Sequence, residues 1–120
     1  MNNKLYHYKI DKLVKVVDGD TIDAVIDLGF NIFVKKRIRL YGIDTPECRT
    51  RDLEEKARGL AAKKKLKQLL TEKKEPIFIE SFGEGKFGRL LAKIYVDQQD
   101  IIATMIHEGY GKEYDGGARR

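Results

Sequence analysis

Residues 13–40 read LVKVVDGDTIDAVIDLGFNIFVKKRIRL, and this stretch decides the expected fold. Apolar and polar residues alternate from Thr21 to Leu28 and again from Asn31 to Leu40, the period of two that half-buried strands show. The Asp18-Gly19-Asp20 turn joins the first of these strands to an earlier one, Leu13–Val17. We therefore expect a meander of three antiparallel strands.

Two helices and two more strands are expected after the meander. They are helix Leu53–Leu70, strands Ile77–Phe82 and Leu90–Val96, and helix Ile101–Glu108. Asp52 and Asp100 precede the helices as N-caps. Helical spacing assigns the core face of the first helix to Leu53, Ala57, Leu60 and Ala61. This order predicts a mainly β protein with helices (α+β), a five-stranded OB-fold barrel with two or three helices; an open α+β sheet is the alternative.

Composition bounds the class of protein and its partners. The 120 residues, 42% of them hydrophobic, suffice for one domain over residues 1–120, with a flexible, glycine-rich tail at residues 110–120. Lysine and arginine exceed aspartate and glutamate by 24 to 19, and the net charge of +5 favours a polyanionic partner. The only cysteine, Cys48, excludes an internal disulfide framework.

No apolar stretch is long enough to cross a membrane or to form the core of a signal peptide. We therefore expect a cytoplasmic, intracellular protein without membrane contact, or a secreted one if a leader has been removed. Nothing indicates an obligate protein partner, so we expect a monomer. A lysine cluster within the first helix is assigned to its solvated face. It consists of Lys63, Lys64, Lys65 and Lys67.

Three carboxylates and one arginine form the most informative chemical pattern. Asp44 and Glu47 flank a proline turn and can converge on one point, and Asp20 comes from the first hairpin. Such oxygen ligands suit calcium or a similar hard cation, whereas a capped turn with solvated acids is the alternative. Arg39 lies five residues before Asp44, and its guanidinium matches two oxygens of a phosphate.

Two formal motif matches do not fit their expected context. The loop that starts at Asp18 is not an EF-hand, because its sixth position is Asp23 rather than glycine. Residues Gly83 to Gly88 match G-x-G-x-x-G, but a strand is expected after them instead of the helix that a dinucleotide site needs. We interpret these glycines as a hairpin connection.

Further basic residues are candidates for binding a phosphate. Arg89 and Lys86 stand at the end of the glycine-rich connection, where the small residues let both side chains approach a ligand. Arg37 lies two residues before Arg39, so both leave the same face of one strand. Arg39 and Arg89 therefore offer two arginines from different strands for one phosphate.

Three segments, in this order, closely resemble the staphylococcal nuclease (thermonuclease) family. They are Val17–Thr21 (VDGDT), Arg39–Glu47 (RLYGIDTPE) and Lys86–Arg89 (KFGR). The resemblance spans about residues 14–111 and includes the family's five-residue step from arginine to aspartate. It implies an OB barrel with helices packed beside it, which agrees with the strands expected above.

The resemblance also implies an activity, the calcium-dependent hydrolysis of DNA and RNA to 3′-phosphate and 5′-hydroxyl ends. By position, Asp20 and Asp44 bind one calcium ion through their carboxylates, and Thr45 binds it through its carbonyl oxygen; other divalent metals are alternatives.

The remaining roles follow from the resemblance in the same way. Glu47 orients or deprotonates the attacking water, while Arg39 and Arg89 clamp the phosphate. Phe87 replaces a tyrosine of the best-known member, so stacking on a nucleotide is kept and a hydroxyl contact is lost. The expected substrate-binding residues are Lys86, Phe87, Arg37 and Tyr114.

Two other functions fit part of the sequence. A catalytically inactive OB-fold module that binds nucleic acid is expected to lose some of the acidic and arginine residues, all of which are present here. A small interaction domain whose acids only form salt bridges does not explain three motifs in register. We therefore expect a metal-dependent endonuclease, a hydrolase acting on single-stranded or locally unpaired DNA or RNA.

Overall fold

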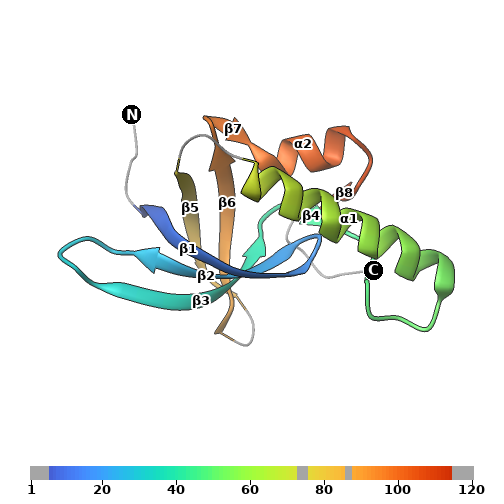
Figure 1. Ribbon diagram of the computed structural model, residues 1–120, viewed down its shortest axis with the longest axis horizontal. Helices are drawn as coiled ribbons and strands as arrows, with labels where there is room; N and C mark the ends of the chain where they lie inside the picture. The colour runs from blue at the N-terminus through green and yellow to red at the C-terminus, as the bar shows by residue number, and fades with distance from the viewer. Residues whose placement is uncertain (1–5, 73–75, 86–87, 115–120) are drawn as a thin grey trace.

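The computed structural model describes residues 6–72, 76–85 and 88–114 (Figure 1). Its long strands are β1 (His7–Asp18), β2 (Thr21–Asp27), β3 (Phe33–Leu40), β5 (Ile77–Glu84) and β6 (Leu90–Val96). The helices are α1 (Leu53–Thr71) and α2 (Ile101–His107). Two-residue strands occur at β4 (Ile43–Asp44), β7 (Gln99–Asp100) and β8 (Lys112–Glu113).

The five long strands close into a barrel. Hydrogen bonds run in the order β3-β2-β1-β5-β6, and a parallel pairing between β3 and β6 joins the two ends. In this pairing Ile38 lies opposite Leu90, and Leu40 lies opposite Ala92. A closed mixed barrel with two helices confirms the predicted OB-type α+β fold and excludes the open sheet.

Strand β1 is longer than the sequence predicted, because it begins at His7 and not at Leu13. Its pairing with β2 is shifted at three places, the last between Val16 and Asp18. Such bulges bend a strand and break the alternation of apolar and polar residues. The bent strand pairs with β2 along most of its length and with β5 near its start, which holds the barrel together.

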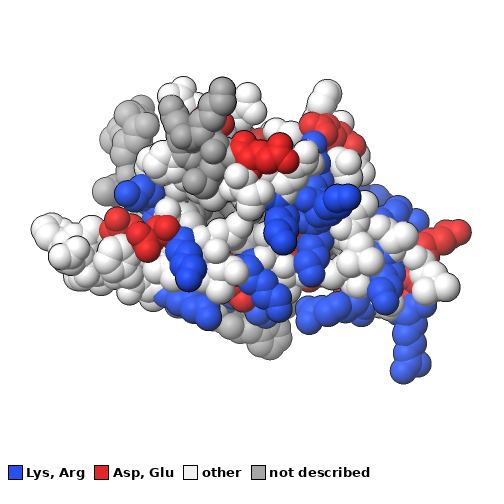
Figure 2. Space-filling model, viewed as in Figure 1, with Lys and Arg blue, Asp and Glu red and all other residues white. Residues whose placement is uncertain are grey.

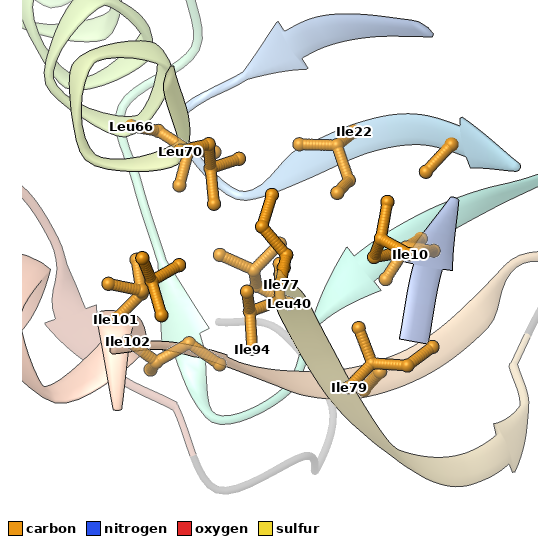
Figure 3. Packing of buried hydrophobic residues seen from close by; sticks show 14 of the residues in the cluster. Ile10, Ile22, Leu40, Leu66, Leu70, Ile77, Ile79, Ile94, Ile101 and Ile102 are labelled. Atoms are coloured by element: carbon orange, nitrogen blue, oxygen red, sulfur yellow. The ribbon is translucent and has the colours of Figure 1, made fainter. Parts of the chain in front are cut away.

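The barrel interior includes alternate residues of β2, β3 and β6 (Figure 3). They are Ile22, Ala24, Ile26, Ile38, Leu40, Ala92, Ile94 and Val96. Two predicted core residues are exceptions, since Leu28 is 40% exposed and Ile32 is 55% exposed. Both lie at the end of the β2–β3 hairpin, which extends beyond the barrel (Figure 1).

Helix α1 begins where the sequence predicted, but a different face of it is buried. The carboxylate of Asp52 accepts hydrogen bonds from the first backbone N–H groups of the helix. Leu53 and Leu60, predicted in the core, are 79% and 46% exposed. The buried face instead consists of Gly59, Ala62, Leu66 and Leu70. Its two small residues let the helix approach the barrel and the loop that follows β4 closely.

The C-terminal part of the described chain packs against the barrel. Asp100 caps α2 as predicted, through hydrogen bonds to the N–H groups of Ile102 and Ala103. Strand β8 pairs with β4, so residues 110–114, where we expected the flexible tail to begin, are part of the fold. Residues 115–120 lie outside the described part. Neither helix has the length and apolar character needed to span a membrane.

Candidate active site

A cleft of about 440 Å³ opens beside the Asp18-Gly19-Asp20 turn, the end of β3 and the loop after β4. Its lining residues are Asp18, Asp20, Thr21, Arg39, Thr45, Pro46, Glu47, Arg49 and Arg89. Five of the residues that the sequence predicted in a catalytic or metal-binding role thus line one cleft. Among them, Asp20 and Arg89 are 69 positions apart in the chain, and the closure of the barrel brings them together.

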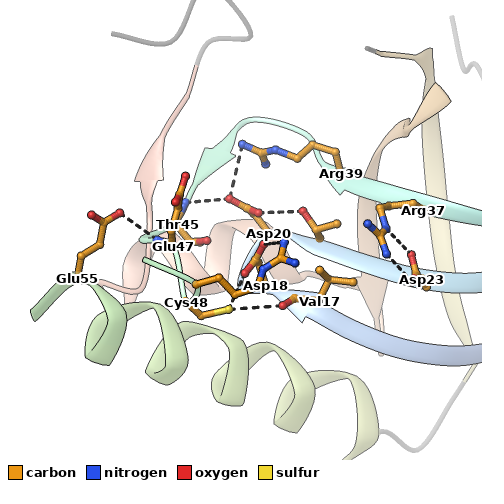
Figure 4. Close-up of polar contacts among 12 residues, drawn as sticks. Val17, Asp18, Asp20, Asp23, Arg37, Arg39, Thr45, Glu47, Cys48 and Glu55 are labelled. Carbon is orange, nitrogen blue, oxygen red and sulfur yellow. Dashed lines mark hydrogen bonds and ion pairs between the residues drawn. The ribbon is translucent and has the colours of Figure 1, made fainter. Parts of the chain in front are cut away.

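Arg39 forms the centre of the site. Its Nη1 donates hydrogen bonds to the carbonyl oxygens of Leu40 at 2.9 Å and Ile43 at 2.8 Å. Its Nη2 lies 3.6 Å from Asp20 Oδ2 and 3.7 Å from Asp44 Oδ1. The side chain is only 14% exposed. These contacts fix the plane of the guanidinium and place two carboxylates beside the same nitrogen, and Figure 4 shows the contact with Asp20.

Asp20 links the first hairpin to the loop after β4. Its Oδ1 accepts a hydrogen bond from the hydroxyl of Thr21 at 3.0 Å, and its Oδ2 accepts one from the backbone N–H of Thr45 at 3.1 Å. Asp20 and Thr45 are both buried. The Thr45 hydroxyl makes no hydrogen bond within the described part of the chain. The arrangement therefore holds carboxylate and hydroxyl oxygens close together in a partly dry environment.

These donors suit a hard cation in chemical type, because all of them are oxygens. Asp20 in the β1–β2 turn and Asp44 on β4 approach the same guanidinium nitrogen, so their carboxylates converge. Within the described residues, however, no three His, Cys, Asp or Glu side chains gather as a metal site. A cation at this place would have two carboxylates available and would need backbone oxygens or water to complete its shell. Asp44 itself lines a neighbouring cavity of about 470 Å³ on the α1 side.

Glu47 is held through its backbone, while its side chain is exposed at the cleft. Its N–H donates to Glu55 Oε2 on α1 at 3.1 Å. The neighbouring Cys48 is buried, and its thiol donates to Asp18 Oδ1 at 2.6 Å and lies 3.6 Å from the carbonyl oxygen of Val17. Burial first, and then this hydrogen bond, raise the pKa of the Cys48 thiol. Contacts on both sides therefore anchor the backbone that carries the Glu47 carboxylate (Figure 4).

Two more arginines reach the cleft. Arg89 lines it, and its Nε is buried without a hydrogen-bond partner among the described residues. Arg49 was not predicted; its Nη2 lies 3.9 Å from Asp18 Oδ2, and its side chain is 75% exposed. The only signal for Arg49 in the sequence is its place two residues after Glu47, which does not reveal the direction of the side chain.

The predicted substrate-binding residues differ in position. The ring of Tyr114 lies 5.9 Å from the Arg39 guanidinium carbon, so this residue is at the site. Arg37 is outside the cleft lining, and its guanidinium forms two hydrogen bonds with Asp23, at 2.8 and 3.0 Å. These hydrogen bonds hold the pKa of the Asp23 carboxyl below its ordinary value. Lys86 and Phe87 lie outside the described residues.

Comparison with known proteins connects this site to a family. A family model described as staphylococcal nuclease homologue matches residues 37–119. Endonuclease YncB of Bacillus subtilis is 30% identical over 91% of this chain and 48% of its own length. The SPbeta prophage-derived endonuclease YokF of the same organism is 32% identical over 83% of this chain and 32% of its own length.

The thermonuclease of Staphylococcus intermedius is 30% identical over 82% of this chain and 55% of its own length. The chain thus spans about half the length, or less, of these relatives. The family match covers the end of β3, the loop with Glu47, and Arg89, which contribute most of the residues that line the cleft. On its sequence and its fold, this chain belongs to the family of staphylococcal nuclease homologues.

Proposed function

We propose that this protein is a metal-dependent nuclease that hydrolyses phosphodiester bonds of single-stranded or locally unpaired DNA or RNA. The observation that carries the proposal is the meeting of Arg39, Arg89 and Glu47 at one cleft next to two converging carboxylates. A phosphodiester is an anion, and its hydrolysis needs positive charge and a positioned water. The cleft offers groups for both needs, and the membership of the nuclease family supports the same activity.

The two arginines have distinct environments that fit distinct tasks. Arg39 is fixed by two backbone carbonyls and faces the carboxylates, so it can hold one phosphate oxygen without reorganising. Arg89 has a buried Nε without a partner in the described chain, and a buried donor of this kind favours an anionic ligand. Together they clamp the phosphate and stabilise the charge that develops on it during attack.

Glu47 is the group that we assign to the attacking water. Its side chain is exposed at the cleft, and its backbone is held by α1, so the carboxylate can orient a water or accept its proton. In-line attack on the phosphorus and departure of the 5′ oxygen leave a 3′-phosphate and a 5′-hydroxyl. Positioning of the water and the phosphate contributes a large part of the acceleration in such a site.

We propose calcium as the metal, held by the carboxylates of Asp20 and Asp44 and by the carbonyl oxygen of Thr45. The oxygen donors and their partly buried position support this assignment. When bound, the ion supplies positive charge at the phosphate. Arg39 then has a second task, since it balances the two carboxylates when the metal is absent.

The experiment that tests the proposal is cleavage of a single-stranded DNA and of an RNA of matched sequence, with added calcium and with excess chelator. We expect cleavage with calcium, none with chelator, and 3′-phosphate ends by mass spectrometry. Cutting that persists in chelator would contradict the metal requirement. DNA binding without cutting under any divalent metal would instead support a catalytically inactive nucleic-acid-binding module.

A further inference from the structure

Helix α1 carries an unusual excess of positive charge. Between Leu53 and Thr71 there are six lysines and arginines but only two glutamates, a net charge of six minus two, or +4. Figure 2 shows Lys and Arg side chains gathered on the face of the molecule that includes α1 and the strands β1 to β3. The buried side of α1 accounts for none of these cations, because it consists of glycine, alanine and leucine.

One edge of the helix is formed by Lys56, Lys63 and Lys67. These residues are seven and four positions apart, so they lie on nearly one line along the helix. Lys63 follows Ala62, which packs so tightly on Gly19 that a Cβ on that glycine would lie 2.6 Å from the alanine Cβ. The middle of the edge, at Lys63, therefore lies next to the turn that carries Asp18 and Asp20.

A second observation places Lys63 beside the catalytic loop. Burial and the hydrogen bond to Asp18 raise the pKa of the Cys48 thiol, and the charges of Lys63 and Arg49 act in the opposite direction. Both cations are therefore close to the residue that follows Glu47. Positive charge thus continues from Arg49 in the cleft to the edge of α1.

On the opposite edge of the same helix, the charge of Lys65 is already bound within the protein. Lys65 Nζ forms an ion pair with Glu108 Oε1 at 3.1 Å and lies 5.9 Å from the centre of the Tyr110 ring. For Lys56, Lys63 and Lys67, no ion pair is recorded with any residue that the structure describes. Lys56 and Lys67 are exposed and Lys63 is half-buried. The edge near the site therefore keeps its charge available for an external anion.

The outer face of strands β1 to β3 is a second basic surface, but it is a weaker candidate for binding a polyanion. Their outer face also carries lysines, but Arg37 is bound by Asp23, and further aspartates stand between the cations. The charge of Arg37 is therefore largely compensated inside the protein. The edge of α1 has no such acid within it, which makes it the stronger site for a polyanion.

We propose that Lys56, Lys63 and Lys67 bind the sugar-phosphate backbone of the substrate strand where it continues beyond the cleft. Four helical residues span about 6 Å, close to the distance between phosphates of an extended single strand. Each phosphate that a lysine neutralises releases counterions, so binding acquires a defined salt dependence. This inference rests on the proposed function for its substrate class, but it concerns residues outside the cleft.

Two double variants with equal changes of charge on the same helix test the proposal. Lys63→Gln/Lys67→Gln alters the edge near the site, and Lys64→Gln/Lys65→Gln, which removes the same charge off that edge and outside both cavities, is the matched control. The probe is a fluorescent single-stranded DNA 20-mer, measured by anisotropy in chelator at several salt concentrations. For the first variant we expect about tenfold weaker binding and a log–log salt slope smaller by roughly 1.4, since each single-strand contact contributes about 0.7.

The control is expected to bind the 20-mer as the wild type does. Equal losses in the two double variants would overturn the proposal, because they would show an effect of net charge alone. With calcium, the KM of the first variant should rise more for the 20-mer than for a dinucleotide substrate. If the wild type binds with this pattern but never cleaves, the proposed activity is wrong and the binding edge stands.

Discussion

Gly59 on α1 lies directly against the backbone of Glu47. A Cβ built on Gly59 would meet the carbonyl oxygen of Glu47, and it would lie 2.5 Å from its carbonyl carbon and 2.6 Å from the backbone nitrogen of Cys48. Together with the hydrogen bond from the Glu47 N–H to Glu55, this contact sets the distance between the helix and the loop. A glycine inside a helix, which lowers helix stability, is thus explained by what packs on it.

Gly59→Ala tests this contact. Helix propensity alone predicts a gain of about 1 kcal/mol in stability, whereas the structure predicts that the methyl group displaces the Glu47 loop. We expect kcat to fall on the order of 10- to 100-fold, since a shift of about 1 Å misplaces a catalytic group, with a smaller change in KM. Ala57→Gly, exposed on the same helix, is the control and should cleave normally. Wild-type kinetics for Gly59→Ala would show that the loop position does not matter.

Arg39 is predicted to depend on its fork and not only on its charge. Arg39→Lys keeps the positive charge but cannot reach two carbonyl oxygens and two carboxylates at once. We expect both Arg39→Lys and Arg39→Ala to lose cleavage by at least about 100-fold. Steady-state kinetics with circular dichroism as a check on folding measure this, and the exposed Arg51→Ala serves as control. Near-normal activity of Arg39→Lys would contradict the assigned geometry.

The Asp23–Arg37 pair predicts a dependence of stability on acid. Hydrogen bonds from Arg37 first, and then its charge, hold the pKa of Asp23 below its ordinary value of 3.8. The stabilisation is therefore complete above that value and disappears as the pH falls through the lowered pKa. In urea unfolding at several acidic pH values, the free energy of unfolding should fall less steeply with decreasing pH for Asp23→Asn than for wild type. Asp11→Asn changes an exposed aspartate on β1 and should show the same pH dependence of the unfolding free energy as wild type. The same pH dependence in all three proteins would refute the contribution of the Asp23–Arg37 pair.

Cys48 is predicted to be an unreactive thiol in the folded protein. Burial and the hydrogen bond to Asp18 raise its pKa, so the reactive thiolate is scarce at neutral pH. Alkylation by iodoacetamide at pH 7.5, followed by mass spectrometry, should be much slower in buffer than in urea. Similar rates in both conditions would mean that the contacts of Cys48 with Asp18 and Val17 do not persist in solution.

Much of the fold could be predicted because alternation is a local property. The β2 and β3 residues that pack on the core follow it until the hairpin leaves the barrel at Leu28. Strand β1 was predicted too short, since its bulges break the pattern. The prediction of the buried face of α1 was wrong for another reason. The helix packs closely through the small residues Gly59 and Ala62, while the larger Leu53 and Leu60 are exposed to solvent.

In the site, too, residues of one sequence segment could be predicted, whereas contacts between side chains of different segments could not. Arg39, Thr45 and Glu47 belong to one short segment, and the chain's order places them together. The contribution of Arg49 and the binding of Arg37 to Asp23 depend on side-chain directions that no motif contains. Asp23 and Arg37 are paired across the β2–β3 hairpin, and Arg49 meets Asp18 because the loop after β4 lies against the end of β1.

We infer that Glu47 acts on the water that attacks a phosphodiester bound in the cleft. Glu47→Gln keeps the size of the side chain and its backbone contacts but removes its ability to accept a proton. The most direct measurement is single-turnover cleavage of a single-stranded DNA in calcium by wild type and Glu47→Gln. We predict calcium-dependent cutting by wild type, at least about 100-fold slower cutting by the variant, and similar DNA binding. Equal cleavage rates for the two proteins would contradict the account.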